Sequence, residues 1–233
     1  MIKRLLIANF SVFILYFIAV RLEIGPLLSF FHATSLIPSW VVFGALWQPF
    51  TYLFIHSPYG FSHILWNMLA LWMFGRILEQ HFGSKKFLQF YFFCGVGAGL
   101  FDVVARIIWG SMDSATIGNS GAVYGIVLAF GYLFPRMPIY LFPLPVTIPA
   151  WVLAAFYGGI SFLSLFDGPN SGVSHVAHLS GMLMAWIFIT RRPSLPDVDW
   201  QQSYRNWKLR RARRKFEVYM NKRDRGDGGG WVN

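Results

Sequence analysis

A serine and a histidine in apolar stretches of this sequence have the chemistry of a nucleophile and its base. Ser120 lies in the run Gly118-Asn119-Ser120-Gly121, whose glycines leave its hydroxyl unobstructed. His178 lies in the run Ala177-His178-Leu179-Ser180-Gly181. A histidine that accepts the hydroxyl proton turns a serine into a nucleophile for acyl transfer. The pair is therefore a candidate catalytic dyad, provided that the fold brings the two residues together.

Each candidate also has an ordinary structural interpretation. A single serine in a membrane helix usually bonds its own backbone, a single histidine is usually a packing residue, and an asparagine commonly holds helices together. Polar residues within apolar spans are nevertheless costly, which makes them candidates for function. Four such residues stand out in this chain: His63, Asn67, Ser120 and His178.

The stretches that contain these residues are long and apolar. Of the 233 residues, 55% are hydrophobic and only 13% are charged, whereas soluble domains carry about a quarter charged residues. Stretches long enough to cross about 30 Å of hydrocarbon occur near 5–20, 61–80, 87–108, 119–135, 150–166 and 173–190. The sequence therefore predicts an all-α polytopic membrane protein, a bundle of six transmembrane helices.

Two other segments differ in composition from these stretches. Four prolines interrupt the apolar segment 21–60, which predicts an outer loop with short interfacial helices within a membrane core that spans 1–192. The tail 193–233 is basic: from Arg191 onward the chain has twelve Lys or Arg and five Asp or Glu, so this part carries +7 of the net charge of +10. Because the tail follows a membrane segment, we expect it to bind anionic lipids of the inner leaflet, and not nucleic acid.

The positive charges between the predicted spans indicate an orientation. If six spans alternate, the following basic residues fall on one side of the membrane: Lys3, Arg4, Arg76, Lys85, Lys86, Arg136, Arg191 and Arg192. Lys and Arg concentrate on the cytoplasmic side of membrane proteins. We therefore expect both termini in the cytoplasm. Since the sequence has no organelle-targeting features, we expect an integral protein of a bacterial inner membrane.

This orientation places the polar residues at a similar depth. Asn67 lies 12 residues before Glu79, Ser120 lies 16 before Arg136, and His178 lies 13 before Arg191. With a rise of 1.5 Å per residue, these separations put the three residues roughly 18, 24 and 20 Å from the inner border. In a layer about 30 Å thick, all three then lie some 10 Å below the outer surface. Three separate segments therefore bring polar groups to one level.

Small residues recur every four positions beside both members of the candidate dyad. One stripe consists of Gly121, Gly125 and Ala129, and the other consists of Ala177, Gly181 and Ala185. Such stripes allow two membrane helices to approach closely. We therefore expect the helices of Ser120 and His178 to pack against each other, with the two side chains within hydrogen-bond distance.

Other residues near this level could support an acyl transfer. The glycine-flanked helix start at Ser120 directs backbone N–H groups towards a developing oxyanion. His63 and Asn67 are four residues apart on one helix face and are candidate oxyanion donors. Tyr124 lies one turn below Ser120, where its ring could stack on that of His178 or simply pack in the core.

The carboxylates are placed unfavourably for a catalytic triad. Glu79 lies at the inner end of its helix, and Asp113 and Asp167 lie in outer loops. Asp102 and Arg106 have the spacing of an ion pair within one helix, to which we assign a structural role. The sequence therefore predicts a Ser–His dyad without an acidic third member.

These motifs resemble the signature of the rhomboid intramembrane serine proteases. The matching runs are His63-Ile64-Leu65-Trp66-Asn67, the eight residues from Gly118 to Gly125, and Ala177-His178-Leu179-Ser180-Gly181, in matching order and spacing over roughly 40–190. The resemblance implies a compact six-helix core and a dyad that opens to the outer side and needs no metal or other cofactor. It makes Ser120 the nucleophile and His178 the general base, with His63, Asn67 and the Ser120 amide as oxyanion donors.

The resemblance implies that the chain cleaves transmembrane segments of membrane protein substrates. One position differs from the family pattern, because Gln48 follows Trp47 where many members have arginine, and this leaves the anchoring of the outer loop open. Two other functions remain as alternatives. One is a non-catalytic rhomboid-like binder of membrane proteins. The other is a membrane metal or haem protein with histidine ligands from His56, His63, His175 and His178.

Overall fold

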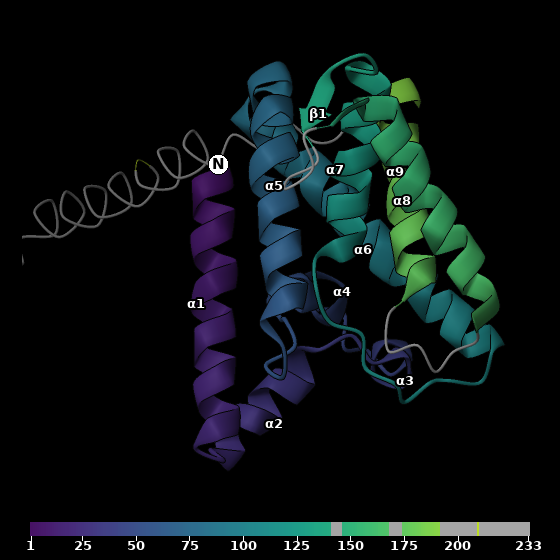
Figure 1. Ribbon diagram of the computed structural model, residues 1–233. Helices are drawn as coiled ribbons and strands as arrows, with labels where there is room; N and C mark the ends of the chain where they lie inside the picture. The colour runs from purple at the N-terminus through teal and green to yellow at the C-terminus, as the bar shows by residue number, and fades with distance from the viewer. Residues whose placement is uncertain (141–145, 168–173, 192–208, 210–233) are drawn as a thin grey trace, which may run out of the picture. The chain divides into compact units, whose positions relative to one another are not determined.

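A computed structural model describes residues 1–140, 146–167, 174–191 and 209 of the chain. The chain divides into two compact units, Met1–Pro193 and Ser194–Asn233. Apart from Leu209, the second unit lies outside the described residues, and with it the predicted lipid-binding tail. The first unit contains every helix that bears a residue of the candidate site (Figure 1).

Six long helices occupy the stretches for which the sequence predicts spans. They are α1 (Ile2–Arg21), α5 (Phe61–Phe82), α6 (Ser84–Ile108), α7 (Ser120–Leu133), α8 (Ala150–Leu163) and α9 (His175–Arg191). Among the residues that the structure describes, α1 and α6 are long and apolar enough to cross a membrane, and α7 and α8 are shorter apolar helices. The predicted helical class is confirmed, whereas the number of six spans stays a prediction.

The connections contain shorter elements. Between α1 and α5 lie α2 (Gly25–Thr34), α3 (Pro38–Val42), α4 (Gln48–Thr51) and the 3₁₀ helix η1 (Tyr52–Phe54). Each of the three α-helices has a proline in its first turn, where the missing N–H costs no intrahelical bond. The prediction of short helices in this segment is confirmed. A second 3₁₀ helix, η2 (Ser164–Asp167), follows α8.

The segment between α7 and α8 lies between two of the predicted spans, and the sequence predicts no structure for it. The structure instead forms a small antiparallel pair of strands, β1 (Pro138–Tyr140) and β2 (Thr147–Pro149), in which Ile139 lies opposite Ile148.

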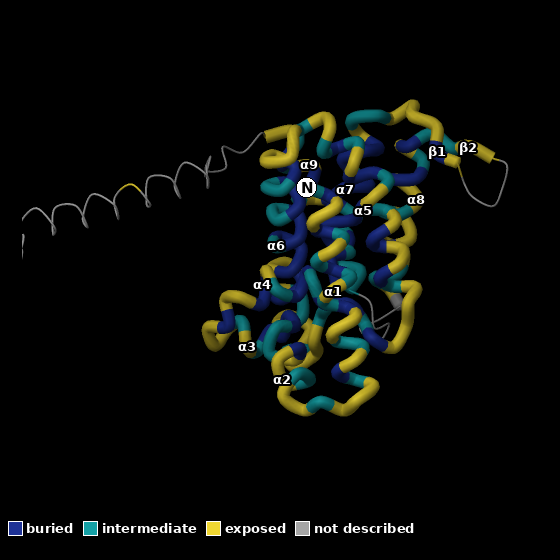
Figure 2. Tube along the Cα trace, turned by 90° about the vertical axis from the view of Figure 1, so that its left-hand side faces the viewer, coloured by how far each residue is buried: buried dark blue, intermediate teal, exposed yellow. Residues whose placement is uncertain are grey.

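Helix α7 lies in the middle of the first unit. It contacts α5, α6, α8 and α9, and nine of its fourteen residues are buried, whereas only five of the twenty residues of α1 are. Figure 2 shows this difference as a mostly dark blue α7 and a largely yellow and teal α1. Ser120 is the first residue of α7, so the most enclosed helix of the bundle positions the candidate nucleophile.

The contact between α7 and α9 brings backbone against backbone. A Cβ atom added at Gly181 would lie 2.0 Å from the carbonyl oxygen of Gly121, and one at Gly125 would lie 2.9 Å from the carbonyl oxygen of Gly181. A Cβ at Gly121 would lie 3.0 Å from the carbonyl oxygen of Ala177. The predicted close approach along the two small-residue stripes is therefore confirmed.

Candidate active site

The local backbone presents Ser120 at a helix start. Gly118 has a φ of +109°, a conformation that glycine adopts readily and other residues rarely do. The ring of His63 also fills the space beside it, because a Cβ at Gly118 would lie 2.9 Å from the His63 Cε1. Helix α7 then begins at Ser120, and its first intrahelical bond comes from the N–H of Val123 to the Asn119 carbonyl. The earlier N–H groups have no partner within the helix and can face an anion.

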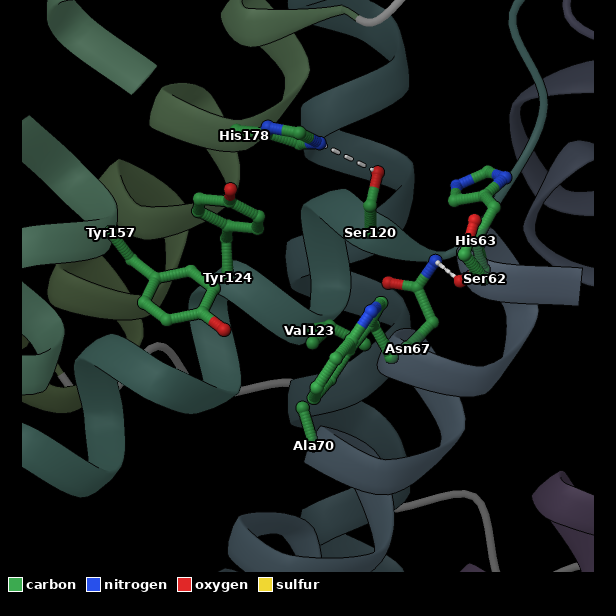
Figure 3. A pocket seen from close by; sticks show the side chains of 10 residues that line it. Ser62, His63, Asn67, Ala70, Ser120, Val123, Tyr124, Tyr157 and His178 are labelled. Atoms are coloured by element: carbon green, nitrogen blue, oxygen red, sulfur yellow. Dashed lines mark hydrogen bonds between the residues drawn. The ribbon is translucent and has the colours of Figure 1, made fainter. Parts of the chain in front are cut away.

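The structure brings Ser120 and His178 together. The Nε2 atom of His178 lies 2.9 Å from the Oγ of Ser120, and the histidine is only 6% exposed (Figure 3). The ring of Tyr124 lies flat on the imidazole, with 3.9 Å between centroids and 9° between planes. The predicted stacking of Tyr124 is thus confirmed, and it fixes the plane of the imidazole.

Ser161 of α8 lies on the other side of the imidazole and was missed by sequence reasoning. Its Oγ is 3.5 Å from the Nδ1 of His178, and the serine is fully buried. If Nδ1 carries the proton and donates to Ser161, Nε2 is free to accept the proton of Ser120. Within the described part of the chain, both hydrogen-bond partners of the His178 ring are serines. The geometry is that of a dyad.

His63 and Asn67 line the same cavity, opposite His178 (Figure 3). The cavity measures about 430 Å³ and is lined by Ser62, His63, Trp66, Asn67, Ala70, Ser120, Val123, Tyr124, Tyr157 and His178. The Nδ2 of Asn67 donates one hydrogen to the His63 carbonyl at 3.0 Å, and an amide nitrogen has a second hydrogen to donate. The two predicted oxyanion donors therefore share a cavity with Ser120, and their catalytic role stays a prediction.

A buried polar network behind Ser120 was also missed. His56 and Asn119 are fully buried; the Nε2–H of His56 donates to the Asn119 Oδ1 at 3.1 Å, and the Asn119 Nδ2 donates to the Tyr91 hydroxyl at 2.9 Å. Asn119 precedes helix α7 without capping it through its side chain. This network fixes the residue next to the candidate nucleophile. The sequence does place an asparagine directly before Ser120. The motif alone does not tell which residues its side chain bonds.

The histidines of the metal alternative lie in two pairs, with 5.3 Å between the ring centroids of His56 and His63 and 5.8 Å between those of His175 and His178. No group of three or more His, Cys, Asp or Glu side chains suited to a metal ion occurs among residues 1–140, 146–167, 174–191 and 209. The Nε2 of His56 bonds Asn119 and that of His178 bonds Ser120. The described part of the chain thus offers these histidines no common metal position.

Gln48 anchors the segment between α1 and α5, at the position where the resemblance leads us to expect arginine. The side chain is fully buried; its Oε1 accepts the N–H of Ile37 at 2.9 Å, and its Nε2 donates to the Ala33 carbonyl at 3.1 Å. The neighbouring Trp47 Nε1 donates to the same carbonyl at 3.0 Å. The side chain of Gln48 therefore joins the end of α2 to the start of α3 by two neutral hydrogen bonds.

Comparison with known proteins identifies the class. Residues 43–192 match the Rhomboid domain, and this range includes the four polar residues that the cavity brings together. Because the match covers more than half of the chain, the protein belongs to the rhomboid family, a family of integral membrane proteins.

Individual relatives come from yeast and from bacteria. Rhomboid protein 1, mitochondrial, of Saccharomyces cerevisiae is 33% identical over 133 residues, 55% of this chain and 37% of that protein. Rhomboid protease GlpG of Haemophilus influenzae is 30% identical over 153 residues, 62% of this chain and 69% of that protein. The putative rhomboid protease YdcA of Bacillus subtilis is 29% identical over 141 residues, 60% of this chain and 63% of that protein. The chain thus spans less than two thirds of the yeast protein and of YdcA.

Proposed function

We propose that this chain is an intramembrane serine endopeptidase that cleaves transmembrane segments of membrane protein substrates. The observation that carries the proposal is the 2.9 Å contact between the Ser120 Oγ and the His178 Nε2 at a helix start that borders a cavity. The match to a family that includes named proteases supports it.

The mechanism is acyl transfer through a covalent intermediate. Ser120 attacks the scissile carbonyl while His178 accepts its proton through Nε2. The oxyanion that forms is stabilised by the backbone N–H groups at the start of α7 together with His63 and Asn67. His178 then donates the proton to the leaving amine, and water hydrolyses the acyl-enzyme. A helical substrate hides its carbonyls, so it must unwind locally, and Gly, Ala or Ser near the scissile bond favours this.

The length of α7 supports the proposed depth of the site. Its 14 residues extend about 21 Å at 1.5 Å per residue, which is roughly 9 Å less than the hydrocarbon layer. If the inner end of α7 reaches the inner border, Ser120 lies below the outer surface, accessible to water from that side. Six spans would place both termini on one side of the membrane, and the positive charges on that side favour the cytoplasm. For the membrane we propose a bacterial inner membrane; the matches to two bacterial proteins favour it, and the match to a mitochondrial protein does not.

The decisive experiment removes each member of the dyad. In the purified protein, Ser120→Ala and His178→Ala should each lower cleavage of a model transmembrane substrate by on the order of 10⁴-fold or more. Ser120→Ala should also abolish labelling by a fluorophosphonate probe. Ser180→Ala is the matched control, because this α9 serine bonds the carbonyls of Val176 and Ala177 on its own helix. A wild-type protein that folds but neither cleaves nor reacts with the probe would instead be a non-catalytic binder.

The oxyanion assignment predicts a smaller effect. Loss of one donor typically costs about 10²–10³ in rate, and the backbone donors of α7 remain. His63→Ala and Asn67→Ala should therefore each lower kcat by about that factor without abolishing cleavage. Single and double variants with wild-type kcat would show that these residues only pack α5.

A further inference from the structure

Asp102 of α6 is a buried carboxylate that accepts hydrogen bonds from its own helix and from two other segments. The residue is 2% exposed. Its Oδ2 accepts the Nε–H of Arg106 at 3.0 Å and the hydroxyl of Thr116 at 2.6 Å. Its Oδ1 accepts the hydroxyl of Ser174. A buried charge is retained only where it is paired and hydrogen-bonded, and here two of the three donors come from outside α6.

Both hydroxyl donors lie four residues before a member of the dyad. Thr116 precedes Ser120 by four positions, and Ser174 precedes His178 by four positions. Thr116 is also fixed by its backbone, which exchanges hydrogen bonds of 2.8 and 3.0 Å with Leu36 of the outer segment. The segment that joins Thr116 to Ser120 is therefore held both by Asp102 and by Leu36.

Ser174 connects Asp102 to His178 directly. Its Oγ accepts the N–H of Ala177 at 3.1 Å, as an N-cap residue does. Its carbonyl accepts the N–H of His178 at 3.2 Å. The residue that donates to Asp102 thus begins α9 and bonds the backbone of the candidate base.

We propose that Asp102 is a positioning residue, which holds the starts of α7 and α9 at the axial offset that joins Ser120 to His178. The glycine contacts between α7 and α9 fix how closely the helices approach, but smooth small-residue faces do not by themselves fix how far one helix slides along the other. Asp102 supplies that constraint from a third helix. The inference rests on the proposed function, since a displacement of about 1 Å at a reacting pair costs on the order of 10²-fold in rate.

Variants of Ser174 separate positioning from helix capping. Ser174→Thr keeps the cap and the hydroxyl donor, whereas Ser174→Asp keeps a capping side chain but places a second carboxylate against Asp102. Asp102→Asn removes the negative charge, and Thr116→Val removes one hydroxyl donor to Asp102. Both substitutions change the shape of the side chain little. Thr190→Val is the control, because the Thr190 hydroxyl bonds the Trp186 carbonyl of its own helix at the far end of α9, away from Asp102.

The measurements are kcat and KM for a model transmembrane substrate, below the melting temperature of each variant. We expect Asp102→Asn and Ser174→Asp to lower kcat by about 10- to 100-fold with little change in KM. Thr116→Val should lower it less. Ser174→Thr and Thr190→Val should keep kcat within about threefold of wild type. Wild-type kcat in Asp102→Asn and Ser174→Asp, or equal losses in Ser174→Asp and Ser174→Thr, would overturn the proposal.

Amide hydrogen exchange tests the positions of the two helix starts without relying on enzymatic activity. In Asp102→Asn, exchange should accelerate over both 116–123 and 174–181 and stay unchanged at the inner ends of α7 and α9. Unchanged exchange at both outer segments would overturn the role of Asp102. If the wild-type protein neither cleaves a substrate nor reacts with the probe, the proposed function fails, and the exchange data alone still decide whether Asp102 positions these helices.

Discussion

Two helix contacts in this protein differ in what separates the helices. Between α7 and α9, carbonyl oxygens lie where a side chain would start, as at Gly121 and Gly181. Between α1 and α5, side chains fill the contact: the ring of Phe13 meets that of Phe61 edge-on with 5.2 Å between centroids. Figure 1 shows α1 running beside α5 at the margin of the first unit.

The difference lies in how each contact can respond to change. Side chains can adopt other rotamers, so a contact made of them can repack at modest cost. Backbone atoms in a helix cannot move without displacing the helix. The α7–α9 contact carries both residues of the dyad, whereas α1 lies outside the matched Rhomboid domain of residues 43–192. The rigid contact therefore belongs to the part of the chain that holds the proposed chemistry.

The largest effect is expected at Gly181. A Cβ there would lie 2.0 Å from the Gly121 carbonyl oxygen, so Gly181→Leu must push α9 away from α7. We expect probe labelling of Ser120 to be lost and the melting temperature in detergent to fall together. Leu133→Ala, at the last residue of α7 and one turn beyond the last small residue of the stripe, is the comparison and should be milder. Wild-type labelling in Gly181→Leu would show that the contact is not rigid.

An intermediate effect is expected at Gly125. Its added Cβ would lie 2.9 Å from the Gly181 carbonyl oxygen and 3.0 Å from the Cβ and Sγ of Cys94. Gly125→Ala should therefore destabilise by about 1–3 kcal/mol, as overpacking typically does, and slow labelling without abolishing it. Gly125→Ala combined with Cys94→Ala removes the sulfur neighbour alone. If the melting temperature recovers only in part, the loss that remains comes from the contact with the Gly181 carbonyl.

The smallest effect is expected at Gly75, on the α1 side of α5. Its added Cβ would lie 2.8 Å from the Cδ1 of Ile2, the far end of a flexible side chain. Because alanine favours a helix over glycine by up to about 1 kcal/mol, Gly75→Ala should change stability by less than about 1 kcal/mol and leave labelling unchanged. Denaturation and labelling of Gly75→Ala beside Gly181→Ala measure the contrast directly. Equal losses in the two variants would remove the distinction between the contacts.

Much of the dyad could be predicted because depth in a helix follows from counting residues. Ser120 and His178 could be placed at one level, and the glycine stripes indicated which helices meet. Ser161 could not be found in this way, since α8 is apolar on all sides and its rotation is set only by packing. The network of His56 and Asn119 depends on the path of a connection, which periodicity does not determine.

The contacts of Asp102 could likewise be predicted only in part. Its spacing to Arg106 predicted the ion pair that the structure contains. Its bonds to Thr116 and Ser174 join segments 14 and 72 residues away, and both partners lie in connections between helices. The two strands β1 and β2 were missed for a similar reason, because three-residue strands beside prolines have too little alternation to recognise.

The separation of the dyad along the chain has a consequence for how the protein is made. Ser120 and His178 are 58 residues apart, and chains grow at about 5–20 residues per second. During synthesis, Ser120 therefore exists for roughly 3–12 seconds before its base has been added. Under the proposed function, the half-built chain then carries a serine hydroxyl that has no base to activate it, so it cannot cut neighbouring chains that are being inserted beside it. The order of synthesis would thus delay the proposed activity until α9 has docked on α7.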